Sequence, residues 1–178
     1  PQRLEYLFPR REPLPTSTWP AVTMVFQGLH LWPHLTIGEN IDLAAKAVGE
    51  TLDNRTMRMV RVLGVEDVLG RRPNQCSGGQ RQKCAILRTY AQRRAIRYLV
   101  ADEITASLDI EAAEIVGDLL HELKVEFNIG LLLISHQLGL ISRLADRVAY
   151  IDQGRIAEQG DRELLTRPSC PGLQKYLK

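Results

Sequence analysis

The sequence contains few cysteines, no long apolar run and little net charge. The three cysteines, Cys76, Cys84 and Cys170, are odd in number and do not have the spacing of zinc or redox motifs. No apolar run approaches the roughly 20 residues that a membrane-spanning helix needs. A formal net charge of +2 argues against nucleic acid as the main partner. We therefore expect no disulfide framework and a reducing, cytoplasmic location.

Prolines crowd the start of the chain. Five of the nine lie at positions 1, 9, 13, 15 and 20, and a segment so rich in proline forms neither a helix nor a central strand. Residues 1–20 are therefore predicted to be irregular. The first residue is Pro1 rather than methionine, so we expect a fragment that lacks its true N-terminus. The length of 178 residues is enough for a domain with its own core.

Beyond Pro20, apolar runs alternate with helical periodicity. Val116, Leu119, Leu120 and Leu123, for example, lie on one face of a predicted helix. The predicted strands are 21–26, 98–101, 131–135, 147–152 and 155–158. The predicted helices are 39–47, 52–63, 81–91, 111–126 and 137–145. Short turns of helix are predicted near Asp67, Arg162 and Leu173. The strands 98–101 and 131–135 have the composition of buried strands. This alternation indicates an α/β fold with a parallel sheet and a late antiparallel hairpin.

Two glycines follow a serine where the third predicted helix begins. Ser77 and Gln80 have the S-x-x-Q spacing of a capping box, and this purely structural role explains both residues. It does not explain Gly78 and Gly79, because a glycine in a helical turn costs roughly 1 kcal/mol relative to alanine. Glycines at a helix N-terminus leave bare N–H groups, which suit a phosphate.

Polar side chains follow three of the predicted strands. Gln27, Asp102 with Glu103, and His136 come directly after them, and in open α/β sheets ligands bind beyond the carboxyl ends of strands. Asp102 suits a magnesium ion, Glu103 could polarise an attacking water, and His136 could donate a hydrogen bond to a phosphate. Gln27 offers an amide oxygen to metal or water. Together these groups predict a nucleoside triphosphatase.

Five ordered motifs resemble those of ATP-binding cassette (ABC) proteins. CSGGQRQK is similar to the family's LSGGQ signature, YLVADE to its Walker B strand and ITASLD to its D-loop. MVFQ resembles the Q-loop and LLLISH the switch-histidine strand. The resemblance covers about Val22 to Lys178. It implies a P-loop NTPase-like ABC ATPase domain over 21–178, with a catalytic core (21–37 and 91–178) and an inserted helical subdomain (about 38–90).

The resemblance also implies a role for each matching residue. Glu103 and His136 would be catalytic, Asp102 and Gln27 would serve a Mg²⁺ ion, and ATP would be contacted by Gln27, Ser77, Gly78, Gly79, Gln80 and Asp109. The signature residues would contact the ATP of the opposite protomer in a head-to-tail dimer. Transmembrane permease subunits, with a solute-binding protein upstream of them, would be the other partners. LHLWPHLTIGENI and DQGRIAEQG are similar to polar amino acid importers, which implies a subunit on the inner face of the membrane.

Three departures from the family pattern stand out. Cys76 replaces the usual leucine of the signature, and Ile104 replaces the usual proline after Glu103, which is expected to loosen a local turn. No glycine in the sequence is followed by lysine, so the G-x-x-x-x-G-K-[ST] phosphate loop is absent. We expect this loop to lie upstream of the printed sequence. The alternative is a catalytically incomplete subunit, or a remnant, that supplies only a signature half-site to a partner ATPase.

Several other groups have structural interpretations. Arg55, Arg58 and Arg61 are predicted to form a solvated helix face, and Arg93, Arg94 and Arg97 are predicted to be surface charges ahead of the strand 98–101. His30 and His34 have a metal-pair spacing, but Pro33 between them argues for a loop without a metal. A chromosome-maintenance ATPase would share the signature but would need long heptad repeats, which are missing.

Overall fold

The computed structural model describes residues 19–26 and 28–177, which form two compact units that divide between Ile134 and Ser135. In the first unit three parallel strands lie in the order β1 (Val22–Val25), β2 (Tyr98–Asp102) and β3 (Gly130–Ile134). Met24 pairs with Val100, and Val100 with Leu132. The predicted parallel sheet is therefore confirmed. Because the strands are parallel, their carboxyl ends share one edge.

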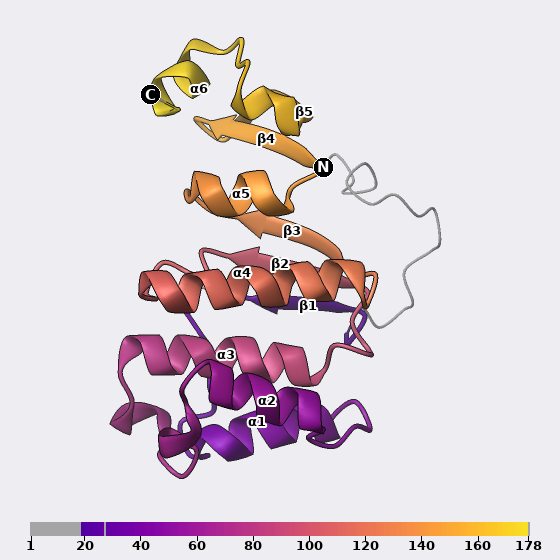
Figure 1. Cartoon of the computed structure of the whole chain (residues 1–178), viewed down its shortest axis with the longest axis vertical. Helices are drawn as coiled ribbons and strands as arrows, with labels where there is room; N and C mark the ends of the chain where they lie inside the picture. The colour runs from indigo at the N-terminus through magenta and orange to yellow at the C-terminus, as the bar shows by residue number, and fades with distance from the viewer. Residues whose placement is uncertain (1–18, 27, 178) are drawn as a thin grey trace. The chain divides into compact units, whose positions relative to one another are not determined.

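The described part of this first unit contains four α-helices. They are α1 (Ile37–Lys46), α2 (Asn54–Val62), α3 (Gly78–Ala91) and α4 (Ile110–Val125), with 3₁₀ turns η2 (Glu66–Val68) and η3 (Pro73–Gln75) between α2 and α3. Figure 1 shows α1, α2 and α3 gathered together, with α3 nearest to β1. Buried side chains of α1 and α3, such as Ile41 and Leu87, lie in the core of this group.

The helix starts follow from capping residues. Thr36 caps α1 with a capping box to Glu39, so the helix begins two residues before the predicted position 39. Asp53 caps α2 by accepting from the Thr56 N–H, so that helix begins two residues after the predicted position 52. The sequence carried both signals, T-x-x-E and D-x-x-T.

The two faces of the sheet differ. Alternate residues of a strand point to opposite faces, and Val25, Leu99 and Ala101 on one face are buried. On the other face Met24 and Leu132 are exposed, in register through Val100. The prediction that 131–135 is a buried strand is therefore wrong for the chain as described, because β3 is an edge strand with one exposed face.

The second unit consists of a hairpin and short helices. The strands β4 (Arg147–Asp152) and β5 (Arg155–Asp161) pair antiparallel, and α5 (Leu138–Leu144), η4 (Arg162–Leu165) and α6 (Pro171–Tyr176) complete it. The predicted hairpin is confirmed, but β5 continues three residues beyond the predicted end at 158. Glu158 accepts hydrogen bonds from the Ser169 and Cys170 N–H groups, which ties β5 to the start of α6.

Candidate functional site

Residues Ser77 to Gln80, which we call the signature turn, lie at the N-terminus of α3. The Ser77 hydroxyl accepts a hydrogen bond from the Gln80 N–H at 3.2 Å, and the Gln80 side-chain oxygen accepts one from the Ser77 N–H at 2.9 Å. The capping box expected from the sequence is therefore present. Ser77 and Gly78 are exposed, so the first turn of α3 presents backbone N–H groups at the surface.

The two glycines of this turn have different surroundings. A Cβ atom at Gly79 would lie 3.3 Å from the Ser107 carbonyl oxygen, whereas a Cβ at Gly78 would meet nothing within 4 Å. Close packing within the chain therefore favours glycine at position 79. It gives no such reason at position 78. The Gly79 contact also brings the loop between β2 and α4 next to the signature turn.

That loop turns sharply where β2 ends. Asp102 is the last residue of β2, and Glu103 follows with a φ of +49°, in the left-handed region. The Glu103 N–H donates to the Ile134 carbonyl at 2.9 Å. A left-handed residue other than glycine costs on the order of 1–3 kcal/mol and is frequent at functional sites. Both carboxylates are half-buried at the carboxyl edge of the sheet.

The rest of the loop is anchored at both ends. Ile104 and Thr105 are buried beneath it, so the isoleucine that replaces the family's proline acts as an apolar anchor. The expectation that Ile104 loosens the turn gains no support from this position. Asp109 is the N-cap of α4 and accepts from the Ala112 N–H at 2.8 Å. Asp109 is nevertheless exposed.

Two of the predicted site residues cannot be placed beside this edge. Gln27 lies outside the described residues. His136 belongs to the second unit, where it is exposed and its carbonyl accepts from the Tyr176 hydroxyl at 2.9 Å. The structure therefore brings together Asp102 and Glu103, and separately Gly79 and the loop before Asp109.

The donor set at the sheet edge suits a magnesium ion that arrives with phosphates. Among residues 19–26 and 28–177, no three His, Cys, Asp or Glu side chains are gathered as a metal cage. Mg²⁺ commonly takes one or two carboxylates and completes its shell with water and substrate phosphates. A single carboxylate such as Asp102 at the end of β2 fits that mode. The same part of the chain contains no helix long and apolar enough to cross a membrane.

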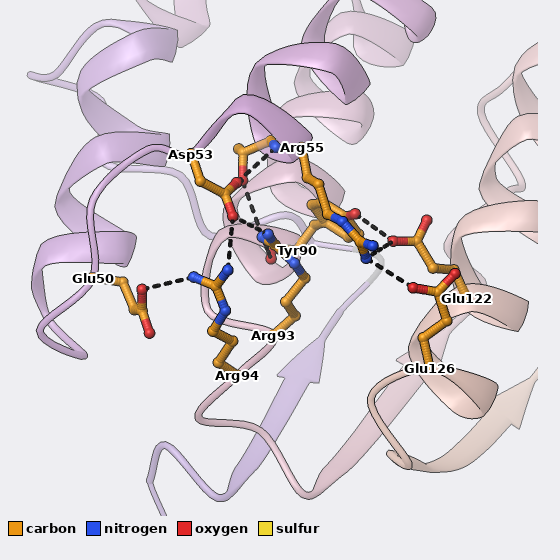
Figure 2. Close-up of polar contacts among 9 residues, drawn as sticks. Glu50, Asp53, Arg55, Tyr90, Arg93, Arg94, Glu122 and Glu126 are labelled. Atoms are coloured by element: carbon orange, nitrogen blue, oxygen red, sulfur yellow. Dashed lines mark hydrogen bonds and ion pairs between the residues drawn. The ribbon is translucent and has the colours of Figure 1, made fainter.

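A network of charged side chains joins α2, α3 and α4 (Figure 2). Arg93 is 2% exposed and bonds the Asp53 carboxylate, the Thr56 hydroxyl at 3.1 Å and the Tyr90 carbonyl at 3.0 Å. The prediction that Arg93 is a surface charge is therefore wrong. Its sequence neighbour Arg94 is exposed as expected, and pairs with Glu50 and Asp53.

The arginines of α2 are exposed but not simply solvated. Arg55 reaches Glu122 of α4 at 3.4 Å and Glu126, the C-cap of that helix, at 2.8 Å. Glu122 also accepts a hydrogen bond from the Tyr90 hydroxyl at 2.6 Å. Arg61 pairs with Glu66 at 3.3 Å. The predicted solvated face therefore holds α2 to α4 through Arg55. Burial and the hydrogen bond to Glu122 raise the pKa of Tyr90.

Comparison with known proteins agrees with these motifs. The family model described as "ABC transporter" matches residues 13–106. The chain is 35% identical over 160 residues to the arginine transport ATP-binding protein ArtP of Haemophilus influenzae, which covers 88% of this chain and 65% of that protein. It is 37% identical over 142 residues to the methionine import ATP-binding protein MetN 1 of Listeria monocytogenes, which covers 78% of this chain and 41% of that protein.

Solved structures show the same fold. The ATP-binding cassette MJ0796, in a dimeric post-hydrolysis state bound to ADP and Pi, matches with a TM-score of 0.68 and 25% identity, over 79% of this chain and 62% of that one. The chain thus spans less than two thirds of the length of these relatives. The family match extends over more than half of the chain, and the sequence motifs and the fold agree with it. The chain belongs to the ABC transporter family of ATP-binding cassettes.

Proposed function

We propose that this chain is part of an ATP-hydrolysing subunit that drives an amino acid importer. The observation that carries the proposal is the order of motifs on the fold: the signature turn at α3, Asp102 and Glu103 at the end of β2, and His136 after β3. The relatives named for arginine transport and methionine import support the substrate class. The helical subdomain would span about 38–90, and the catalytic core 21–37 and 91–178.

The roles of the residues follow from their chemistry. Asp102 would hold a Mg²⁺ ion, which neutralises phosphate charge when bound. Glu103, on its left-handed turn, would accept a proton from the attacking water. His136 would donate a hydrogen bond to a phosphate oxygen. Gln27 would contact the metal or its water, and Asp109 would approach the nucleotide across the dimer.

The signature turn would act on the partner protomer. Ser77, Gly78, Gly79 and Gln80 would contact the ATP held by the opposite subunit of a head-to-tail dimer, which agrees with the dimeric state named for MJ0796. The dimer could be made of two copies of this chain or of two related chains. Permease subunits, and a solute-binding protein upstream of them, would place the assembly on the cytoplasmic face of the membrane.

Glu103→Gln in the full-length protein tests the proposal. Loss of the general base should reduce ATP turnover by roughly 10²- to 10⁴-fold, while dimerisation in the presence of ATP remains. Glu66→Gln is the matched control, because Glu66 is an exposed carboxylate that pairs only with Arg61 among the described contacts. Wild-type turnover in the Glu103→Gln protein would remove Glu103 from the catalytic role.

Gly78→Ala tests the signature turn separately. Nothing within 4 Å opposes a Cβ there, so alanine should leave stability unchanged or raise it by up to about 1 kcal/mol. ATP turnover should nonetheless fall, because the new methyl group stands where a partner's phosphate would approach the backbone. Equal turnover in the wild-type and Gly78→Ala proteins would show that the Ser77–Gln80 turn serves only as a capping box. Thermal unfolding measures the stability of the wild-type and Gly78→Ala proteins, and an ATPase assay on the same samples measures their turnover.

The second candidate is an incomplete subunit that only lends its signature turn to a partner. The 178 residues contain no G-x-x-x-x-G-K-[ST] motif, and a subunit that lacks this motif throughout its length would fit the second candidate. The intact mass of the polypeptide from its native source separates the two. A mass several kilodaltons above 20.1 kDa agrees with a phosphate loop upstream, and a mass of 20.1 kDa supports the incomplete subunit.

A further inference from the structure

The loop that follows Gln27 has an unusual backbone. Leu29 and His30 are consecutive residues in the left-handed region, with φ values of +60° and +40°. Residues other than glycine rarely adopt this conformation, and two in succession persist only where the surroundings impose them. We call residues 28–36 the post-Q loop. It ends at Thr36, the N-cap of α1.

Arg88 of α3 supplies one such constraint. Its guanidinium donates to the His30 carbonyl at 2.6 Å and to the Leu29 carbonyl at 3.3 Å, and thus binds the carbonyls of both left-handed residues. The same group lies 5.2 Å from the centre of the Trp32 ring, within the range of a cation–π contact. Burial lowers the pKa of Arg88, but an arginine stays charged. Three groups of the post-Q loop therefore converge on one side chain.

Asn40 of α1 supplies the second constraint. Its side chain is fully buried, accepts from the Trp32 N–H at 2.9 Å and donates to the carbonyls of Trp32, Leu35 and Thr36. The post-Q loop is thus tied to α1 at its second half. Among the described residues, Arg88 is the side chain whose hydrogen bonds tie the first half of the loop to α3, the helix that begins with the signature turn.

We propose that Arg88 is a positioning residue that fixes the post-Q loop on the signature helix. A planar guanidinium holds its donors in a fixed fork that can bridge two adjacent carbonyls while its flat face stacks on an indole; an ammonium has three donors but neither the fixed fork nor a flat face. Arg88 lies in the last turns of α3, while Ser77 caps the start of the same helix. A rigid helix gripped at one end by Arg88 keeps the backbone after Gln27 in a fixed relation to the signature turn. This inference rests on the proposed function for its effect on turnover, but not for its structural content.

The test uses the full-length protein with its partner subunits. Arg88→Met removes the donors and keeps the length of the side chain, and Arg88→Lys keeps the charge without the planar fork. Arg155→Met is the matched control, because Arg155 is exposed on the hairpin of the second unit and its side chain has no hydrogen bond or ion pair with the described residues. The readouts are kcat and KM for ATP, thermal unfolding, and acrylamide quenching of Trp32. The quenching is measured on the ATPase subunit without its membrane partners, in a background where Trp19 and any other tryptophan of that subunit are changed to phenylalanine, so that Trp32 alone is observed.

We expect kcat to fall roughly 10- to 100-fold in Arg88→Met, because a small misplacement of a reacting group has effects of that size. KM for ATP should stay within about twofold, as for a group that acts in turnover rather than in ground-state binding. Trp32 should be quenched more readily in Arg88→Met, and Arg88→Lys should recover turnover only in part. Arg155→Met should match the wild type in every readout.

Two outcomes would overturn the inference. One is full recovery of turnover and quenching by Arg88→Lys, which would show that charge alone suffices. The other is unchanged Trp32 quenching in Arg88→Met. If the wild type itself does not hydrolyse ATP, the proposed function fails, and Trp32 quenching still decides whether Arg88 holds the loop. If Arg88→Met does not fold, Arg88→Lys carries the same comparison.

Discussion

Removing the Arg93 side chain should strongly destabilise the first unit. The side chain is 2% exposed and its cation lies 4.4 Å from the Tyr90 ring and 5.3 Å from the Phe127 ring. Breaking a buried ion pair by removing one partner typically costs about 3–5 kcal/mol. Two observations favour the lower end of that range. The Asp53 side chain is 25% exposed and keeps Arg94 at 3.3 Å, and no group of the described residues accepts a hydrogen bond from the buried Arg93 Nε.

Urea denaturation of the full-length Arg93→Ala protein measures this cost. We expect the free energy of unfolding to fall by about 3 kcal/mol. The matched control is Arg94→Ala, the next residue and also a partner of Asp53, whose side chain is 52% exposed. An exposed pair contributes about 0.2–1 kcal/mol, so this control should lose no more than that. Equal losses in the two variants would refute the reasoning, because burial would then have no influence on the strength of the pair.

Two further predictions use ionisable groups. Burial raises the pKa of the Cys84 thiol to about 12. At pH 8 a thiol reagent should therefore label the half-buried Cys76 and Cys170 of the native protein, but should label Cys84 only after denaturation. Fast labelling of Cys84 in the native protein contradicts this. Partial burial alone would raise the pKa of Asp53, but the Thr56 hydrogen bonds and the charge of Arg93 outweigh it and lower the pKa. The stabilisation that the ionised Asp53 gives to the fold is therefore present above about pH 4 and is lost as the pH falls through the lowered pKa. The unfolding free energies of the wild type and Asp53→Asn should therefore approach each other as the pH falls below about 4. A difference between the two proteins that stays constant in acid contradicts this.

The elements of the fold could be predicted because their signals are local. The apolar run before Gln27 and the alternation at 147–152 specify strands by their own residues, and Leu119, Leu120 and Leu123 specify one face of α4. The errors fell at boundaries, where a cap decides. The exposed face of β3 was also missed, because an apolar run shows that a strand can be buried on both faces but not whether anything covers them.

The pairings of the arginines could not be predicted for a different reason. Arg93 and Asp53 are 40 residues apart, and Arg88 and His30 are 58 apart. The sequence does not distinguish an arginine on the solvent-exposed surface from one in a buried ion pair, because its partner is set by how the helices pack. Asn40 gave a weak signal, because a polar residue interrupts the apolar face of its helix between Ile37, Ile41 and Ala44.

Of the two glycines after Ser77, Gly79 has a structural reason within the chain and Gly78 has none. Ser77 and Gln80 satisfy each other as a capping box, and Gly79 is favoured by the Ser107 carbonyl against its Cβ position. Gly78 has no such neighbour and no left-handed backbone, yet it occupies a helical turn where alanine would be more stable by up to about 1 kcal/mol. A residue that costs stability without a cause inside the chain points to a cause outside it. Bare N–H groups at an exposed helix start suit a phosphate group, and under the proposed function that phosphate belongs to a partner's nucleotide. Gly78→Ala is therefore the substitution in the signature turn that we expect to lower ATP turnover without lowering stability.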